Sequence, residues 1–113
     1  MHTEALVKFV INSLEDMKGR DIITIDVHQQ STITDQMIIC SGNSKRHVQS
    51  IAENLVLDAK HAQLPVLGSE GKDAGEWVLV DLGNVIVHVM QDEARDFYQL
   101  EKLWKPVSEM QAG

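Results

Sequence analysis

The stretch Trp77-Val-Leu-Val-Asp-Leu-Gly-Asn-Val-Ile-Val-His-Val-Met90 contains two apolar runs separated by Gly83-Asn84. Glycine and asparagine tolerate the positive φ angles that two-residue turns require, so the stretch predicts a tight β-hairpin. The turn sets the register of the two strands, because successive side chains on a strand point to opposite faces. One face then carries six aliphatic side chains that must be buried against helices. These side chains pair as Leu82 with Val85, Val80 with Val87 and Val78 with Val89.

The opposite face of the predicted hairpin mixes large apolar groups with a carboxylate and an imidazole. It pairs Asp81 with Ile86, Leu79 with His88, and Trp77 with Met90. Tryptophan is common among binding anchors and methionine adapts to irregular surfaces, so this face is a candidate docking surface. The alternative is that a second helix covers the face and that Trp77 is an ordinary core residue.

Helical and strand periodicities predict the elements before the hairpin. A first helix follows Thr3, a candidate N-cap, and stops at Gly19. Its apolar stripe comprises Leu6, Phe9, Val10, Leu14 and Met17. Alternating β-branched residues predict a strand over 21–27, and the apolar run over 35–41 predicts a second, mostly buried strand. Ser44 is the natural N-cap of a second helix. The inner face of that helix holds Val48, Ile51, Ala52, Leu55, Ala59 and Ala62.

Shorter elements are predicted around the hairpin. Pro65 suits a sheet edge, where a missing N–H is harmless, so 65–67 predicts a short edge strand and the glycine-rich residues 68–75 predict a loop. One last helix follows the hairpin and is ended by Pro106. Its inner face holds Ala94, Phe97, Leu100 and Trp104, and its outer face holds Tyr98, Glu101, Lys102 and Lys105. The outer charges also fit an ordinary solvated helix face.

The order of these elements predicts a single α/β (α+β) domain. Its mixed sheet has four or five strands, with helices packed on the aliphatic face. A chain of 113 residues is long enough for one domain with a real core. We expect the domain over residues 1–105, followed by a short tail over 106–113.

Composition narrows the classes of function. Ten basic against seventeen acidic residues leave a net charge of −7, which opposes direct contact with nucleic acid because that binding needs Lys and Arg to replace counterions. An acidic domain is instead attracted to basic protein surfaces. The sequence has no apolar run long enough to cross a bilayer, and charged residues within 1–17 argue against a signal peptide. A cytoplasmic protein without a membrane partner is therefore expected.

The cysteine and histidine content predicts no cofactor. Cys40 lies in an apolar run and is the only cysteine, so a buried, inert thiol is favoured over a nucleophile and no disulfide can form within the chain. The five histidines show no metal-ligand spacing, so no metal site is expected. His47 either binds a partner or caps local structure near the start of the second helix, and the pattern favours the second role.

Three blocks occur in order along the chain and carry a family resemblance. They are Thr34-Asp-Gln-Met-Ile-Ile-Cys-Ser-Gly-Asn-Ser-Lys-Arg-His-Val48, Glu76-Trp-Val-Leu-Val-Asp-Leu-Gly-Asn-Val-Ile-Val-His-Val-Met90 and Phe97-Tyr-Gln-Leu-Glu-Lys-Leu-Trp104. Together they resemble the ribosomal silencing factor family, the bacterial and organellar Iojap proteins. The resemblance covers about residues 5–104, and no counterpart is identified after Lys105. It implies a nucleotidyltransferase-like topology and a factor that is not an enzyme.

The resemblance further implies binding to the large ribosomal subunit through its fourteenth protein, at the face where the small subunit docks. Subunit joining would be blocked and translation repressed when nutrients run short, while organellar relatives are associated with assembly of the large subunit. The implied partner-binding residues are Trp77, Leu79, Asp81, His88, Met90, Arg95, Tyr98 and Glu101. Trp77, Met90 and Tyr98 would be apolar anchors. Asp81 and Glu101 would meet lysine or arginine, and His88 would add a hydrogen bond. Arg95 would lie at the rim.

Two other classes of function stay open at this point. A nucleotide-handling enzyme is suggested by residues 41–44, which precede a helix N-terminus where amides and the helix dipole can hold a phosphate beside Lys45 and Arg46. Phosphoryl transfer, however, needs paired metal-binding carboxylates, and the strands offer only Asp26 and Asp81 on separate elements. A homodimer, in which the mixed hairpin face meets its own copy, is the third possibility.

Overall fold

The computed structural model describes residues 2–29, 32 and 34–103. Over these residues the helices and strands are α1 (Thr3–Asp16), β1 (Arg20–Asp26), β2 (Gln36–Gly42), α2 (Lys45–His61), β3 (Gly68–Glu70), β4 (Trp77–Asp81), β5 (Val85–Gln91), α3 (Asp92–Tyr98) and α4 (Leu100–Leu103). The strands form one mixed sheet in the order β1-β2-β5-β4-β3, in which only β2 and β5 run parallel. The predicted α+β domain with a mixed sheet is confirmed.

The β4–β5 hairpin has the predicted register. The ladder pairs Trp77 with Met90, Val78 with Val89, Leu79 with His88, Val80 with Val87, and Asp81 with Ile86. At the turn, the Leu82 N–H donates to the Val85 carbonyl over 2.9 Å, and Gly83 adopts the positive φ of 89° that glycine accommodates best. All six aliphatic side chains of the predicted inner face are buried. The hairpin is therefore confirmed, together with its core-facing side.

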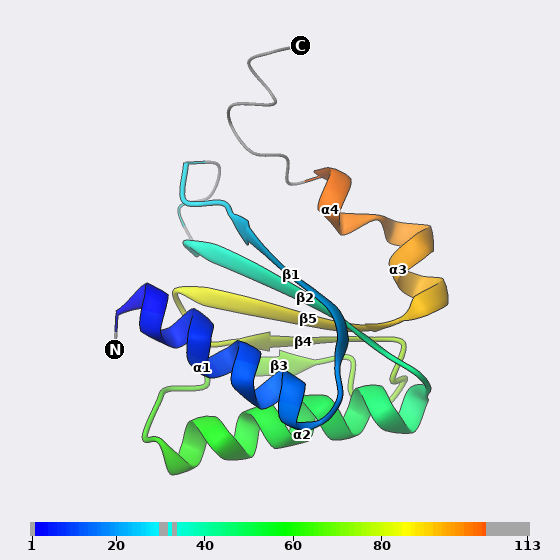
Figure 1. Ribbon diagram of the computed structural model, residues 1–113, viewed down its shortest axis with the longest axis horizontal. Helices are drawn as coiled ribbons and strands as arrows, with labels where there is room; N and C mark the ends of the chain where they lie inside the picture. The colour runs from blue at the N-terminus through cyan, green and yellow to red at the C-terminus, as the bar shows by residue number, and fades with distance from the viewer. Residues whose placement is uncertain (1, 30–31, 33, 104–113) are drawn as a thin grey trace.

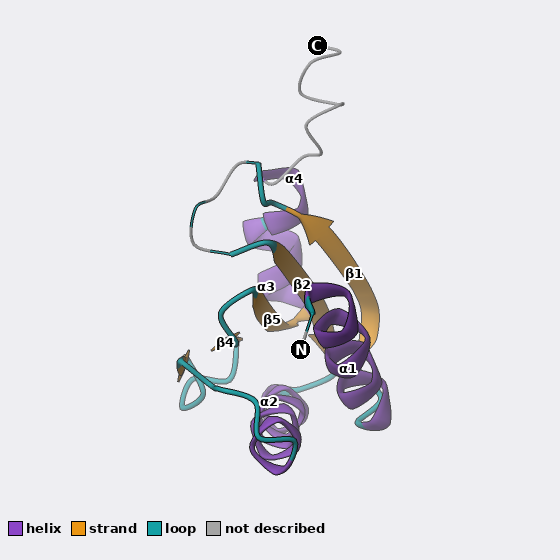
Figure 2. Cartoon of the chain, turned by 90° about the vertical axis from the view of Figure 1, so that its left-hand side faces the viewer, coloured by secondary structure: helices purple, strands orange, loops and turns teal. Residues whose placement is uncertain are grey.

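Helices α1 and α2 cover the aliphatic face of the sheet (Figure 2). Ser44 caps α2 as predicted, because its hydroxyl accepts the His47 N–H over 3.1 Å. Cys40 is fully buried beneath these helices, and burial raises the pKa of its thiol to about 11. The predicted burial of the thiol is thus confirmed, and its raised pKa agrees with low reactivity. None of the helices in the described ranges is long and apolar enough to span a bilayer.

Helix α3 lies on the other face of the sheet, beside β5 and β2, and α4 follows it (Figures 1 and 2). A second, smaller core lies between these helices and the sheet. Its buried members are Ile25, Val27, Met37, Ile39, Met90 and Leu100. The mixed face of the hairpin is therefore partly covered. Part of it is buried, as the core alternative predicts, and part stays accessible, as the docking-surface alternative predicts.

The first helix differs from the prediction at both ends. His2 is its N-cap, while Thr3 is the first helical residue and its hydroxyl donates to Asp35 over 3.2 Å. At the other end, the helix stops at Asp16 and not at Gly19, and Lys18 is the residue there with a positive φ, of 60°. Gly19 is needed for a different reason: a β-carbon there would lie 2.4 Å from the Cys40 sulfur.

The predicted edge strand over 65–67 and the loop over 68–75 are corrected by β3. The strand forms at Gly68–Glu70 instead, where it pairs with β4. All three of its residues are exposed, so main-chain hydrogen bonding to β4 places this strand and apolar burial does not.

The single last helix is also corrected. Gln99 adopts a left-handed conformation, with a φ of 50°, and divides the segment into α3 and α4. The break lets Leu100 enter the second core while Phe97, predicted to face inward, is 79% exposed. Trp104, Lys105 and the predicted tail over 106–113 lie outside the described residues.

Candidate functional site

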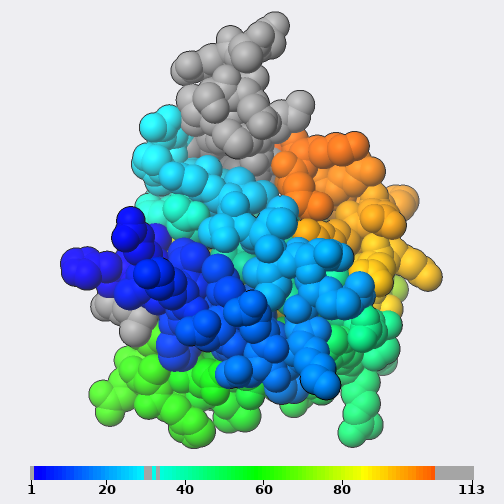
Figure 3. All heavy atoms as spheres, in the orientation of Figure 1, coloured from blue at the N-terminus to red at the C-terminus, as the bar shows by residue number. Residues whose placement is uncertain are grey.

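The outward side of β4 and the exposed side of α3 form one surface. Trp77 and Leu79 on β4 are half-buried, while Phe97 and Tyr98 on α3 are 79% and 47% exposed. We call these four residues the docking face. In the space-filling view, α3 and α4 lie at one edge of the molecule (Figure 3). An exposed aromatic surface of this kind is typical of a binding site.

Ring contacts connect the docking face to the sheet. The Trp77 and Tyr98 rings lie 4.8 Å apart between centroids, and Phe97 packs edge-on against Tyr98 at 5.1 Å. The orientation of the Trp77 ring is fixed by a hydrogen bond, in which its indole N–H donates to Nδ1 of His88 over 2.8 Å. Tilted and edge-on pairs of this type add to the stability of an aromatic cluster beyond their buried area. The docking face is thus supported from within the fold.

His88 belongs to the interior and not to the surface. It is 5% exposed, and burial lowers the pKa of its imidazole to about 4, so the ring is neutral near pH 7. Nδ1 accepts the Trp77 hydrogen bond, which places the proton on Nε2. The Nε2 atom is buried and has no partner within the described part of the chain. The prediction that His88 offers a hydrogen bond at the surface is therefore wrong, because Nδ1 is already used inside.

A pocket of about 310 Å³ adjoins the docking face. Its lining combines two carboxylates with aromatic and small side chains: Glu76, Gln91, Glu93, Ala94, Phe97 and Tyr98. Gln91 stabilises the wall of the pocket, because its side-chain amide on β5 donates to the Gly75 carbonyl before β4 over 2.8 Å. A lysine or arginine side chain fits this chemistry, with its stem on an aromatic ring and its charge beside a carboxylate.

Three further residues predicted to meet a partner are engaged within the protein. Met90 is fully buried in the second core beneath α3 and α4, so the prediction of an exposed anchor is wrong. The Arg95 side chain is 11% exposed and donates to Ser41 over 2.7 Å, so it does not lie at the rim. Glu101 accepts from Arg95 over 3.4 Å, so its charge is already paired inside the chain.

Asp81 and Leu79 keep positions that agree with the predicted surface. Both are half-buried on the outward side of β4. Asp81 also accepts the Gly83 N–H over 2.8 Å, so one of its oxygens stabilises the hairpin turn. Leu79 lines a shallow pocket of about 240 Å³ together with Trp77, Glu70 and Gly71.

Phe97, Glu76 and Glu93 belong to the site although the sequence reasoning did not select them. Phe97 was placed on the inner side of one long helix, and the break at Gln99 makes that phase wrong. The two glutamates are separated in the sequence and meet only where α3 follows β5. The available signal was local: a pair of acidic residues at 92–93 followed closely by two adjacent aromatic residues.

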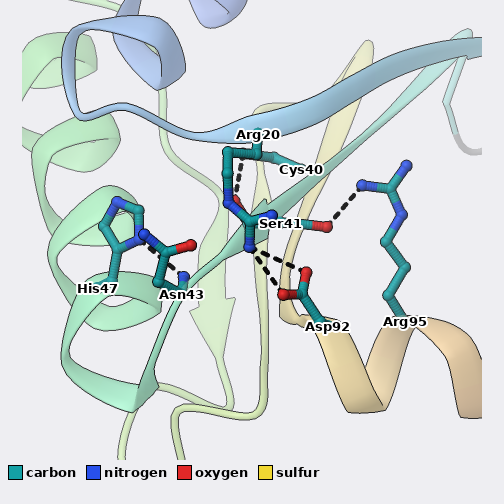
Figure 4. Close-up of polar contacts among 7 residues, drawn as sticks. All are labelled: Arg20, Cys40, Ser41, Asn43, His47, Asp92 and Arg95. Carbon is teal, nitrogen blue, oxygen red and sulfur yellow. Dashed lines mark hydrogen bonds and ion pairs between the residues drawn. The ribbon is translucent and has the colours of Figure 1, made fainter.

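The geometry around α2 does not favour phosphoryl transfer. Asp26 on β1 pairs with His28, and Asp81 lies three strands away on β4, a separation of about 14 Å at ordinary strand spacing. No group of three or more His, Cys, Asp or Glu side chains suited to a metal occurs among the described residues. His47 has both ring nitrogens in use, one accepting from the Asn43 N–H (Figure 4) and the other 2.8 Å from the Met17 carbonyl. These contacts agree with a role for His47 in local structure.

Comparison with known proteins agrees with the resemblance seen in the sequence. A family model described as "Ribosomal silencing factor during starvation" matches residues 1–112. A Haemophilus influenzae protein named ribosomal silencing factor is 51% identical over 100 residues, which make up 88% of this chain and 98% of that protein. The chain belongs to the ribosomal silencing factor family. It is thereby placed among regulators of translation that are associated with the ribosome.

Two other similarities extend the match to structure and to an organelle. A crystal structure of a Chromobacterium violaceum protein aligns with a TM-score of 0.90 at 42% identity, covering 94% of this chain and 91% of that one. A mouse protein named mitochondrial assembly of ribosomal large subunit protein 1 is 38% identical over 101 residues, 87% of this chain and 44% of that protein. The ribosomal silencing factor match includes every element of the docking face, and it continues past Lys105.

Proposed function

We propose that the protein binds the large ribosomal subunit through its fourteenth protein and so prevents the small subunit from joining. The observation that carries this proposal is that exposed aromatic rings lie beside Glu76 and Glu93, which form no ion pair within the described part of the chain, in a member of the ribosomal silencing factor family. A translation factor with such a surface needs a partner that is both apolar and basic. A basic ribosomal protein satisfies both requirements.

The charge of α3 supports a protein partner over direct contact with RNA. The helix carries Asp92, Glu93 and Asp96 against one arginine, and that arginine is paired internally. Phosphates would be repelled by this helix, whereas lysine and arginine side chains would be attracted to it. Steric exclusion of the small subunit from the cytoplasmic ribosome would then require no catalysis.

Sedimentation tests the proposal directly. The purified protein is centrifuged with large subunits, small subunits and joined ribosomes, and we expect it to migrate with large subunits alone. Adding small subunits afterwards should yield fewer joined particles than in the absence of the protein. Migration with small subunits only, or with no particle, would refute the proposal.

Two variants test the docking face and one serves as a matched control. Phe97→Ala and Tyr98→Ala remove exposed aromatic side chains of the docking face, and each should weaken binding by about 2 kcal/mol if its ring is an anchor. Leu57→Ala removes a side chain of α2 that is 54% exposed and lies away from α3, so affinity should stay unchanged. Equal losses in all three variants would mean that the docking face is wrongly assigned.

A role in maturation of the large subunit is a second candidate. It is favoured by the match to the mouse protein, whose name refers to assembly of that subunit. The two roles differ in timing, because a maturation factor would be found on incomplete large particles in growing cells. Self-association through the exposed aromatic rings would compete with either role, and sedimentation of the protein alone at rising concentration would detect it.

A further inference from the structure

Helix α3 presents Phe97 and Tyr98 of the docking face without fully burying any residue of its own. A helix of seven residues is far too short to be stable in isolation. The apolar contacts of α3 are few: Ala94 packs partly against the second core, and the Tyr98 ring contacts Trp77. Polar contacts to neighbouring elements therefore add to the constraint on its orientation.

Arg95 makes the most extensive of these contacts. Its Nη1 donates to the Ser41 hydroxyl on β2 over 2.7 Å (Figure 4), and its Nε donates to Glu101 on α4 over 3.4 Å. Its carbonyl also accepts the N–H of Gln99, the residue at the break between the two helices. One side chain thus joins the sheet, α3 and α4.

A second contact, between Arg20 of β1 and Asp92 at the start of α3, is more exposed. The guanidinium lies 3.0 and 2.8 Å from the two carboxylate oxygens, and the two side chains are 40% and 56% exposed. Surface pairs of this kind contribute little, because water screens them. The Arg95 contacts are better protected, since the Arg95 side chain is 11% exposed and Ser41 is 1% exposed.

We propose that Arg95 is a positioning residue, which fixes α3 and α4 so that Phe97 and Tyr98 are presented to the partner. This inference rests on the proposed function, because it assigns the orientation of the same surface. Arginine suits the role because its planar guanidinium offers donors in two directions at once, toward Ser41 and toward Glu101. A lysine ammonium keeps the charge but cannot reproduce this fork.

Ser41→Ala and Arg95→Lys provide the decisive variants. Ser41 is buried, so a partner cannot touch it, and any effect on binding must pass through Arg95. Each variant should weaken binding to large subunits by about tenfold, the usual scale for a lost hydrogen bond to a charged group. Arg46→Lys, at an exposed arginine on α2, is the matched control and should leave binding unchanged.

A double-mutant comparison separates positioning from direct contact. In the Tyr98→Ala background, Arg95→Lys should weaken binding less than it does in the wild type, because one of the two rings that it orients is gone. An undiminished loss in that background would show a direct contact between Arg95 and the partner and would overturn the proposal. Unchanged affinity in both Ser41→Ala and Arg95→Lys would overturn it as well.

NMR of the free protein tests the same inference without the ribosome. In both variants the contacts between the Trp77 and Tyr98 rings, 4.8 Å apart in the wild type, should weaken while the core signals persist. Unchanged ring contacts would overturn the positioning role even if binding falls. If the wild type binds no large subunit, the proposed function fails, and the ring contacts alone decide the role of Arg95. If either variant fails to fold, Glu101→Gln provides a replacement test. It removes the charge of Glu101, the partner of Arg95 on α4, and is expected to weaken the same ring contacts.

Discussion

Acidification from about pH 8 to about pH 5 should destabilise the wild-type protein by about 2 kcal/mol more than a His88→Asn variant. His88 is buried and accepts a hydrogen bond from the Trp77 indole, so the folded state holds it neutral. Asparagine keeps an acceptor oxygen near the position of Nδ1 but has no proton to bind in this range. The variant therefore removes the titration while preserving the contact to Trp77.

The magnitude follows from the pKa of His88. Burial lowers this pKa from 6.5 to about 4, and each unit corresponds to about 1.4 kcal/mol. In the unfolded chain the imidazole takes up a proton as the pH falls below 6.5, whereas in the folded protein it resists until near pH 4. Stability is therefore lost as the pH falls through this window. The loss reaches about 2 kcal/mol near pH 5 and about 3 kcal/mol below pH 4.

Urea unfolding followed by far-UV circular dichroism at both pH values measures this difference. His28→Asn is an informative comparison, because the hydrogen bond to Asp26 raises the pKa of His28. Its contribution to stability is present below pH 6.5 and is lost as the pH rises, so it opposes the effect of His88. Equal pH dependence in the wild type and His88→Asn would refute the assignment of a buried, neutral His88.

Three further predictions concern the core between the sheet and helices α1 and α2, and the N-cap of α2. Gly19→Ala should destabilise the protein by about 1–3 kcal/mol in urea unfolding, because the added β-carbon would lie 2.4 Å from the Cys40 sulfur and 3.0 Å from the Leu14 carbonyl; unaltered stability would contradict this packing. The Cys40 thiol, buried and with a pKa of about 11, should react with Ellman's reagent far more slowly in native than in urea-unfolded protein, and equal rates would mean that the site opens readily. Ser44→Ala should cost about 1 kcal/mol of unfolding free energy, since the His47 N–H loses its acceptor, and a cost near zero would show that water replaces the cap.

Sequence reasoning succeeded where short-range rules control the structure. The Gly83-Asn84 turn and the alternation on either side of it predict the strand register, and the observed ladder agrees residue by residue. Ser44 was likewise identified from its place before an amphipathic helix. Both features depend on residues that lie within a few positions of one another.

The candidate site was predicted less completely, because its side chains are sorted by contacts between distant segments. The region was correct, and Trp77, Leu79, Asp81 and Tyr98 do lie at or near the surface. Met90 and His88 share the outward side of the same hairpin, yet both are buried beneath other elements. Alternation along a strand cannot distinguish these outcomes.

The sequence by itself determined the hairpin, its register and its aliphatic core face, because turn chemistry and side-chain alternation act between neighbours. Only the tertiary structure decided which outward side chains reach solvent. That choice depends on where α3 and α4 pack, and so on the break at Gln99, the burial of Leu100 and the bond between Arg95 and Ser41. The last of these joins residues 54 positions apart, and no local pattern encodes a contact over that range.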